Sequence, residues 1–114
     1  MDWWVGHLVG DYLFQNDWMA QGKKRSSFIC LCHVLVYTGA VGLFTAWPIW
    51  ALLVVAVPHF LIDRWQIVPW YMRLVGQTAF MAPPMSPWSR IVVDNVMHVV
   101  CLFATQRLIE AIAP

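Results

Sequence analysis

The sequence predicts an all-α, polytopic integral membrane protein, a four-helix bundle that forms a single membrane domain over residues 1–114. Apolar residues make up 61% of the chain and charged residues only 11%, against roughly 25% charged residues in an average soluble domain. A soluble domain this small has too much surface to hide so many apolar side chains. Eight tryptophans are also typical of the two interfacial belts of a membrane protein.

The first helix is predicted over about residues 3–20 and is the most polar of the four. It contains two glycines and five polar or charged side chains, namely His7, Asp11, Gln15, Asn16 and Asp17. The residues before it lack the positive charges of a signal peptide. We therefore expect an uncleaved first span.

The second and third helices are predicted over about residues 26–46 and 48–68. The apolar stretch from Phe28 to Phe60 is longer than the roughly 20 residues that one span needs, and shorter than two full spans. Pro48 divides it, because proline favours a first helical turn and disfavours helix at the residue before it. Pro58 predicts a kink just before His59.

The fourth helix is predicted over about residues 88–111, after a long loop. Residues 69–87 contain four prolines and Gly76, which are typical of a loop. Within this loop, Trp70 to Val75 is expected to form a short turn at the membrane interface.

The basic residues predict the orientation of the chain. They gather between the first and second helices and around the loop between the third and fourth, namely Lys23, Lys24, Arg25, Arg64, Arg73 and Arg90. The positive-inside rule places both loops in the cytoplasm and both termini outside. A formal net charge of +1 argues against a nucleic-acid partner, which attracts clustered excess cations.

Histidines and carboxylates inside the apolar helices are the candidate functional residues, since such groups are costly in a membrane. Three pairs are spaced four residues apart and share a helix face, and a fourth histidine stands alone: His7 with Asp11, His59 with Asp63, Asp94 with His98, and His33. Counted from the cytoplasmic helix ends at 1.5 Å per residue, they lie roughly 8–20 Å deep. A bundle core can collect them as metal ligands.

Imidazoles with carboxylates predict one or two divalent ions, with zinc first and manganese or iron as alternatives. Two ions that share a carboxylate can activate water and stabilise the oxygens of a phosphoester. Asp63 or Asp94 is the predicted catalytic base. A hydrogen-bonded polar network that holds the helices together and an ion or proton path are the alternatives.

Four further side chains are candidates for roles beside the metal. Gln15 shares the face of His7 and Asp11 and could orient a ligand. Tyr37 lies one turn after His33 and could donate to a phosphoryl oxygen or only satisfy the bundle. Arg64 and Arg90 are either anchors at the membrane boundary or a clamp on an anionic head group.

At these motifs the chain resembles a family of small multi-pass membrane proteins of bacteria and their phages, which has no established activity. Members open with His-x-x-x-Asp-Tyr-x-x-Gln, continue with a histidine in the next helix and then carry His-Phe-x-x-Asp; the matching residues are His7, Asp11, Tyr12, Gln15, His33, His59, Phe60 and Asp63. The resemblance implies the bacterial inner (cytoplasmic) membrane. More distantly, the chain is similar to predicted membrane-bound metal-dependent hydrolases.

The expected function is metal-dependent hydrolysis, most plausibly of a phosphoester in a lipid or lipid-linked substrate. One alternative is a non-enzymatic membrane module that binds a host membrane partner and uses its metal structurally. The other is an ion or proton conduit, which ranks last because the second and fourth helices offer few polar residues toward the outside. Membrane lipids are the expected surroundings, and the oligomeric state stays open.

Overall fold

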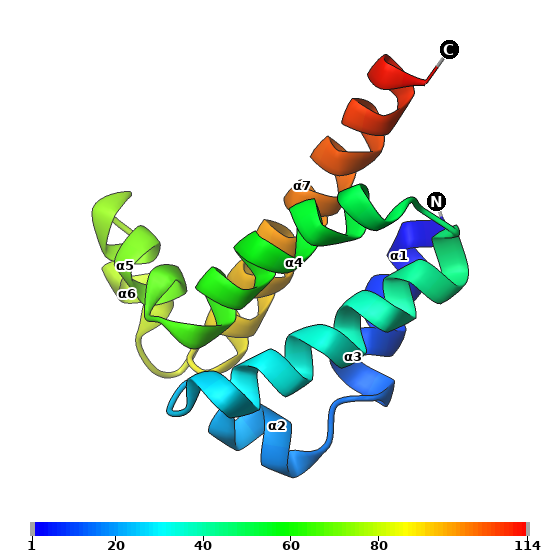
Figure 1. The fold of residues 1–114 in the computed structure, drawn as a ribbon. Coiled ribbons are helices and arrows are strands. Elements are labelled where there is room, and N and C mark those ends of the chain that lie inside the picture. The colour runs from blue at the N-terminus through cyan, green and yellow to red at the C-terminus, as the bar shows by residue number, and fades with distance from the viewer. Residues whose placement is uncertain (1, 114) are drawn as a thin grey trace.

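Three long helices form the scaffold of the molecule. The structure is a computed structural model that describes residues 2–113, and within them every regular element is helical. Helices α3 (Ser27–Thr45) and α4 (Ile49–Arg64) form an antiparallel hairpin, and α7 (Trp88–Ile112) packs against α4 (Figure 1). The predicted all-α class is therefore confirmed.

The chain before α3 is not the single helix predicted over residues 3–20. It forms α1 (Asp2–Leu8), the π-helix η1 (Val9–Leu13) and α2 (Asp17–Gly22). Asn16 stops the first part, because it is extended and its side chain caps α2 by accepting from the backbone N–H of Met19 at 2.9 Å. The twelve residues of α1 and η1 rise only about 18 Å, which is too short to cross a hydrocarbon core of about 30 Å.

The turn between α3 and α4 lies where Pro48 predicts it. Ala46 ends α3 in the left-handed region with φ of 54°, and Pro48 is the N-cap of α4. At its other end, α3 is capped by Ser26, whose hydroxyl oxygen accepts from the backbone N–H of Ile29 at 3.3 Å. Helix α4 runs through Pro58 without interruption.

The third helix ends earlier than the predicted residue 68. Helix α4 stops at Arg64, and α5 (Ile67–Leu74) follows at 78° to it. The predicted loop over residues 69–87 holds most of α5 and also α6 (Thr78–Met81). Helix α5 forms there because it is amphipathic, and it buries one face against Ile62 and α6 through Val68 and Met72.

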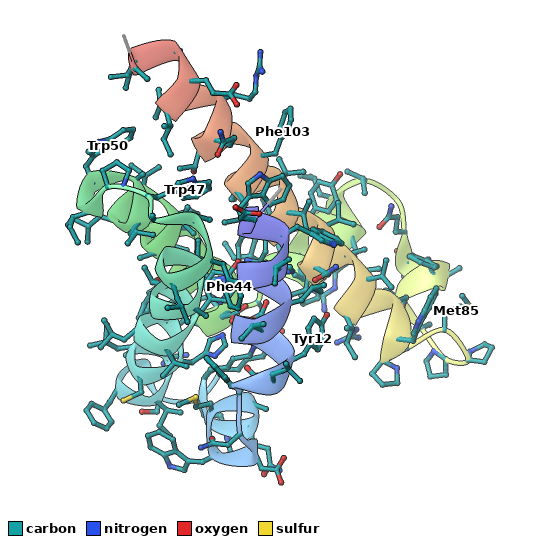
Figure 2. The ribbon with its side chains drawn as sticks, turned by 90° about the vertical axis from the view of Figure 1, so that its right-hand side faces the viewer. Tyr12, Phe44, Trp47, Trp50, Met85 and Phe103 are labelled. Carbon is teal, nitrogen blue, oxygen red and sulfur yellow. The ribbon has the colours of Figure 1, made fainter. Side chains whose placement is uncertain are left out.

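Two helices, α3 and α7, are long and apolar enough to cross a membrane, and the bent pair α4 and α5 would make a third. The predicted four spans are thus reduced to two or three in residues 2–113, because the first segment is broken at residues 14–16. Large apolar side chains such as Trp50 and Phe103 are exposed and point outward (Figure 2), and Phe44 is exposed as well. Such a surface is expected of helices that face lipid.

Two apolar clusters leave a polar layer between them. One cluster contains Trp3, Tyr37, Val41, Val55 and Leu102, and the other contains Ile62, Val68, Met72 and Met81. On α4, His59 lies between Val55 of the first cluster and Ile62 of the second. The scaffold therefore holds buried polar groups in the middle of the bundle, closed by apolar packing above and below.

Candidate metal centre

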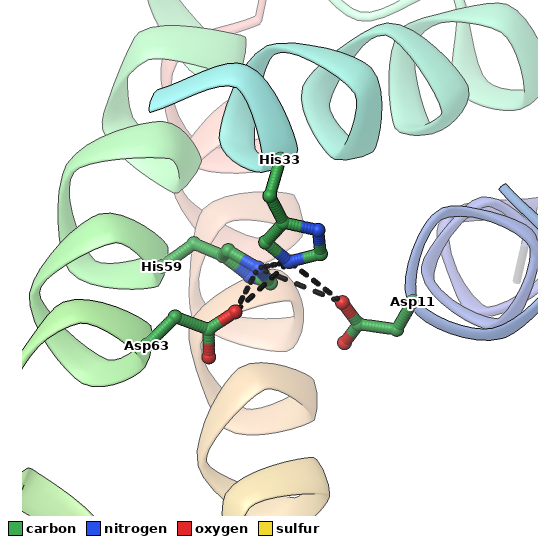
Figure 3. Close-up of side chains that lie close together, drawn as sticks. All are labelled: Asp11, His33, His59 and Asp63. Atoms are coloured by element: carbon green, nitrogen blue, oxygen red, sulfur yellow. Dashed lines mark hydrogen bonds and ion pairs between the residues drawn. The ribbon is translucent and has the colours of Figure 1, made fainter. Parts of the chain in front are cut away.

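Four buried side chains from three elements converge on one point in this polar layer. Asp11 comes from η1, His33 from α3, and His59 and Asp63 from successive turns of α4 (Figure 3). Each is at most 7% exposed. The predicted pair on α4 and the lone histidine on α3 are therefore brought together with a carboxylate from the N-terminal segment.

The distances between these atoms have the size that a small divalent ion requires. His33 Nε2 and His59 Nε2 are 3.0 Å apart, and they lie 2.9 and 3.0 Å from Asp63 Oδ2. Asp11 Oδ1 lies 3.3 Å from His33 Nε2 and 3.6 Å from His59 Nε2. Four ligand atoms held about 2.0–2.1 Å from zinc form a tetrahedron with edges of about 3.3 Å. This buried Asp/His cluster could hold a metal ion.

Two local features fix the orientation of the ligand side chains. Asp11 lies in the π-helix, a distortion that is frequent at functional sites, and its Oδ1 is buried without a hydrogen-bond donor. The His59 ring is stacked between two other rings, with centroids 3.8 Å from Tyr37 and 4.0 Å from His98. A buried carboxylate oxygen without a donor is costly, and a cation at this point would satisfy it.

Asp63 also belongs to a second group, with Asp94 and His98 of α7. Its Oδ1 lies 2.9 Å from His98 Nε2, which is also 3.4 Å from Asp94 Oδ2. The two oxygens of Asp63 thus face different groups, as a bridging carboxylate does. Asp94 differs from the other members because its side chain is 25% exposed.

Lys23 is the residue at this site that the sequence analysis missed. It follows α2, and its Nζ donates to Asp63 Oδ2 at 3.0 Å. Burial disfavours the ammonium, but the nearby charges of Asp63 and Asp11 and the hydrogen bond to Asp63 outweigh it and raise the pKa of Lys23. Lys23 is therefore a permanent positive charge against the cluster. Its place in a run of basic residues indicates only topology, so the sequence held no signal for this contact.

His7 is the only predicted ligand that joins neither group. Its Nδ1 lies 2.8 Å from the Tyr37 hydroxyl, and its Nε2 lies 2.5 Å from Asn95 Oδ1. A neutral imidazole meets both partners when Nε2–H donates to Asn95 and Nδ1 accepts from Tyr37. Asp11 Oδ2 is more distant, at 3.6 Å from Nδ1. His7 therefore anchors Tyr37, whose ring packs on His59. The contact of His7 with Asn95 joins two helices, so the pattern along one helix did not predict it.

The family comparison covers nearly the whole chain. The model of a family described as "Protein of unknown function (DUF3307)" matches residues 1–113. The chain belongs to DUF3307. Searches of curated proteins and of solved structures gave no significant match. The DUF3307 match spans both candidate metal groups and supplies no activity, so any function has to be argued from the geometry of the site.

In this DUF3307 member the remaining predicted residues take different places around the centre. Gln15 Nε2 donates to the backbone oxygen of Asp11 at 3.1 Å and so holds the ligand-bearing turn. Arg64 donates to Ser27 Oγ at 3.0 Å and to the backbone oxygen of Lys24 at 2.8 Å, which ties the end of α4 to the start of α3. Arg90 instead lines a cavity together with Asp94.

Proposed function

We propose that this protein is a membrane-embedded, metal-dependent hydrolase that acts on a phosphoester of a lipid or lipid-linked substrate. The observation that carries the proposal is that the two carboxylate oxygens of Asp63 face different groups of side chains. Its Oδ2 faces His33 and His59, whereas its Oδ1 faces His98. A carboxylate shared in this way is typical of sites that hold two ions close together.

The chemistry of the side chains suits zinc first, with manganese and iron as alternatives. Asp11, His33, His59 and Asp63 would hold one ion, and Asp63, Asp94 and His98 would hold the other. Bound ions of this kind lower the pKa of water and stabilise negative charge on phosphoryl oxygens. The second group offers only three protein ligands, which leaves room for substrate or water, as catalytic zinc sites do.

Among the two predicted bases, Asp94 suits proton transfer better than Asp63. Asp63 has no exposed surface, and its oxygens already face three histidines and Lys23. Asp94 is partly exposed and lies on the wall of a cavity. We therefore assign Asp94 the transfer of the proton and Asp63 the bridging of the two groups. Tyr37 keeps the His59 ring in place by stacking on it.

We propose a location in the bacterial inner membrane, with several spans, and the apolar helices support it. Helices α3 and α7 are long enough to cross, and large apolar side chains cover their outer surfaces. A centre buried between such helices is reached most directly by a substrate that is itself in the membrane. This supports a lipid or lipid-linked substrate over a soluble one.

One observation favours the non-enzymatic alternative. Lys23 already places a positive charge on Asp63 at 3.0 Å, so the carboxylate is paired without a metal. In that case the histidines and carboxylates would form a polar network that fixes the packing of the helices. The two functions differ in whether the purified protein contains metal.

Metal analysis of the detergent-purified protein tests the proposal. We expect about two equivalents of zinc, manganese or iron in the unchanged protein. His59→Ala should lower the metal content because it removes a ligand atom from the four-residue group. Thr105→Val is the control, since Thr105 is a buried polar residue of α7 that joins neither group, and it should keep the metal content. A metal-free unchanged protein would overturn the proposal.

A further inference from the structure

A cavity of about 450 Å³, lined by both polar and apolar side chains, opens beside the candidate metal centre. It lies between α2 with the residues that flank it, α5 and the first turns of α7. Its wall includes Asp94, a member of the second metal group, and Lys23, which contacts Asp63. The polar side chains that line it are Gln15, Lys23, Lys24, Gln66, Arg90 and Asp94. The cavity therefore reaches the centre from outside.

The cavity carries an excess of positive charge. Of its three cations, Lys23 is paired with Asp63. Within residues 2–113, neither Lys24 nor Arg90 forms an ion pair, and both are exposed. Asp94 is the only carboxylate on the wall, and it is directed to His98 at 3.4 Å. Lys24 Nζ donates to the backbone oxygen of Asp63 at 3.3 Å, so its charge is not matched by a carboxylate. The charges of Lys24 and Arg90 thus remain for an anionic ligand.

The position of the cavity suits a ligand at a membrane surface. Exposed tryptophans lie on three of the elements around it, namely Trp18 on α2, Trp70 on α5 and Trp88 on α7. Tryptophans of this kind mark the level of lipid head groups. The wall also includes Ile91 at 52% exposure, next to Arg90 on α7. An apolar surface thus continues directly from the basic wall.

We propose that this cavity binds the phosphate of a membrane-anchored phosphate monoester through Lys24 and Arg90. A phosphate monoester carries close to two negative charges at pH 7, which these two cations balance, whereas a diester carries one. The guanidinium of Arg90 can bind two phosphate oxygens at once. The inference names the substrate class of the proposed hydrolase and rests on that function for the reaction, but not for binding.

The reaction on such a ligand needs only water. The oxygen of water would form a new bond to phosphorus while the bond from phosphorus to the ester oxygen breaks. The proton taken up by Asp94 would pass to the released alcohol, which stays in the membrane, and inorganic phosphate would leave. Asp94 lies on the cavity wall and also belongs to the second metal group, so it is placed between the bound ligand and the metal centre.

Calorimetric binding of dioctanoyl phosphatidic acid to the full chain in detergent tests the inference. EDTA is present, so that neither turnover nor metal contributes to binding. We expect binding by the unchanged protein and a loss of about tenfold or more in affinity for Lys24→Gln and for Arg90→Gln, since each removes a charged hydrogen-bond donor. Arg107→Gln is the control, because Arg107 is an exposed cation of α7 outside the cavity, and it should bind normally. Normal binding by both cavity variants would overturn the inference.

Three further ligands identify the group that is recognised. Dioctanoylglycerol lacks the phosphate, and dioctanoyl phosphatidylglycerol is a diester with half of its charge. Both should bind at least about tenfold more weakly than phosphatidic acid. Equal binding of either one would overturn the monoester assignment. If inorganic phosphate binds as tightly as phosphatidic acid, the inference that the ligand is anchored in the membrane is overturned. If the purified protein binds phosphatidic acid but contains no metal, the proposed hydrolase function is contradicted, whereas the inference about the ligand of the cavity holds.

Discussion

Asp63 is a carboxylate without exposed surface, in contact with four nitrogen-bearing side chains from different parts of the chain. An isolated buried charge of this kind costs several kcal/mol. Lys23 offsets that cost permanently, and the three histidines offset it further by donating N–H groups or by sharing a metal with it. Asp63 is therefore the residue whose loss would affect both candidate metal groups.

The Asp94→Asn substitution separates the catalytic role from a structural one. Asparagine keeps the shape and can still hydrogen-bond to His98, so the thermal melt should stay within a few degrees of the unchanged protein. Phosphoester turnover should fall by roughly 100- to 10,000-fold, the usual contribution of a general base. Parallel melting and turnover measurements check this. A stable variant with normal turnover would rule out Asp94 as base.

The four-residue spacing predicts which neighbouring side chains share a helix face, but not whether they meet: His7 Nδ1 and Asp11 Oδ2 lie 3.6 Å apart, and only Asp11 joins a candidate metal group. The spacing of four residues places His59 beside Asp63, and the structure has them 3.0 Å apart. Contacts from distant elements carry no such signal. Lys23 lies 40 residues before Asp63, and Asn95 lies 88 residues after His7. Both depend on how the helices are placed, which no local pattern encodes.

At the scale of elements, the close approach of α1 to α3 depends on glycine. A Cβ at Gly6 would lie 2.7 Å from Val41 Cα, which is backbone and cannot move aside easily. This contact lets η1 bring Asp11 to within 3.3 Å of His33. The N-terminal segment therefore contributes its ligand only as long as the two backbones can touch.

Gly6→Ala should lower the free energy of unfolding by about 1–3 kcal/mol, the usual cost of overpacking. Bound metal should fall with it, because Asp11 moves away from the histidines. Gly39→Ala is the matched control on α3, since a Cβ there meets nothing within 4 Å. The control should be neutral or stabilising by up to about 1 kcal/mol. Denaturant titration and metal analysis measure both effects. Equal stability of the two variants would contradict the contact.

The sequence predicts best those helices that are determined by their own composition. Helices α3 and α7 are long and apolar, so composition alone places them within a residue or two of the structure. Helix α5 is predicted only as a short turn over Trp70 to Val75, because its proline suggests a loop. Pro69 in fact lies in the first turn of the helix, where proline is tolerated. Asn16 breaks the first segment because it caps α2. This capping signal is hard to recognise in the sequence, since the segment around it is polar as well.

At the scale of the whole molecule, the two chain ends lie at the same end of the bundle (Figure 1). Asp2 and Trp3 line one cavity together with Thr45 and Ile109. The contacts of Arg64 with Ser27 and Lys24 lie at the opposite end of the α3–α4 hairpin. This arrangement separates the termini from the basic loops.

Cysteine labelling from either side of the membrane checks the orientation. With the three native cysteines replaced by alanine, single cysteines at Lys24 and Arg73 should react only from the cytoplasm, because positive loops stay inside. Cysteines at Asp2 and Ala113 should react only from outside. Asp2 lies beside Thr45 and Ile109, at the end of the bundle opposite the basic loops, although no unbroken helix before α3 crosses the membrane. A cytoplasmic N-terminus with an external C-terminus would mean that the segment before α3 does not reach the outer surface.

The sharing of ligands among elements has a consequence for the order in which the centre assembles. His33, His59 and Asp63 all belong to the α3–α4 hairpin, which is contiguous from Ser27 to Arg64. Such a hairpin can form early, since its contacts are local. It would capture a first ion with three ligands, and Asp11 would then close that site from the N-terminal side. A second ion at Asp63, Asp94 and His98 would be bound only after α7 has packed against the hairpin. Metal supply during synthesis would thereby influence how quickly the last helix finds its place.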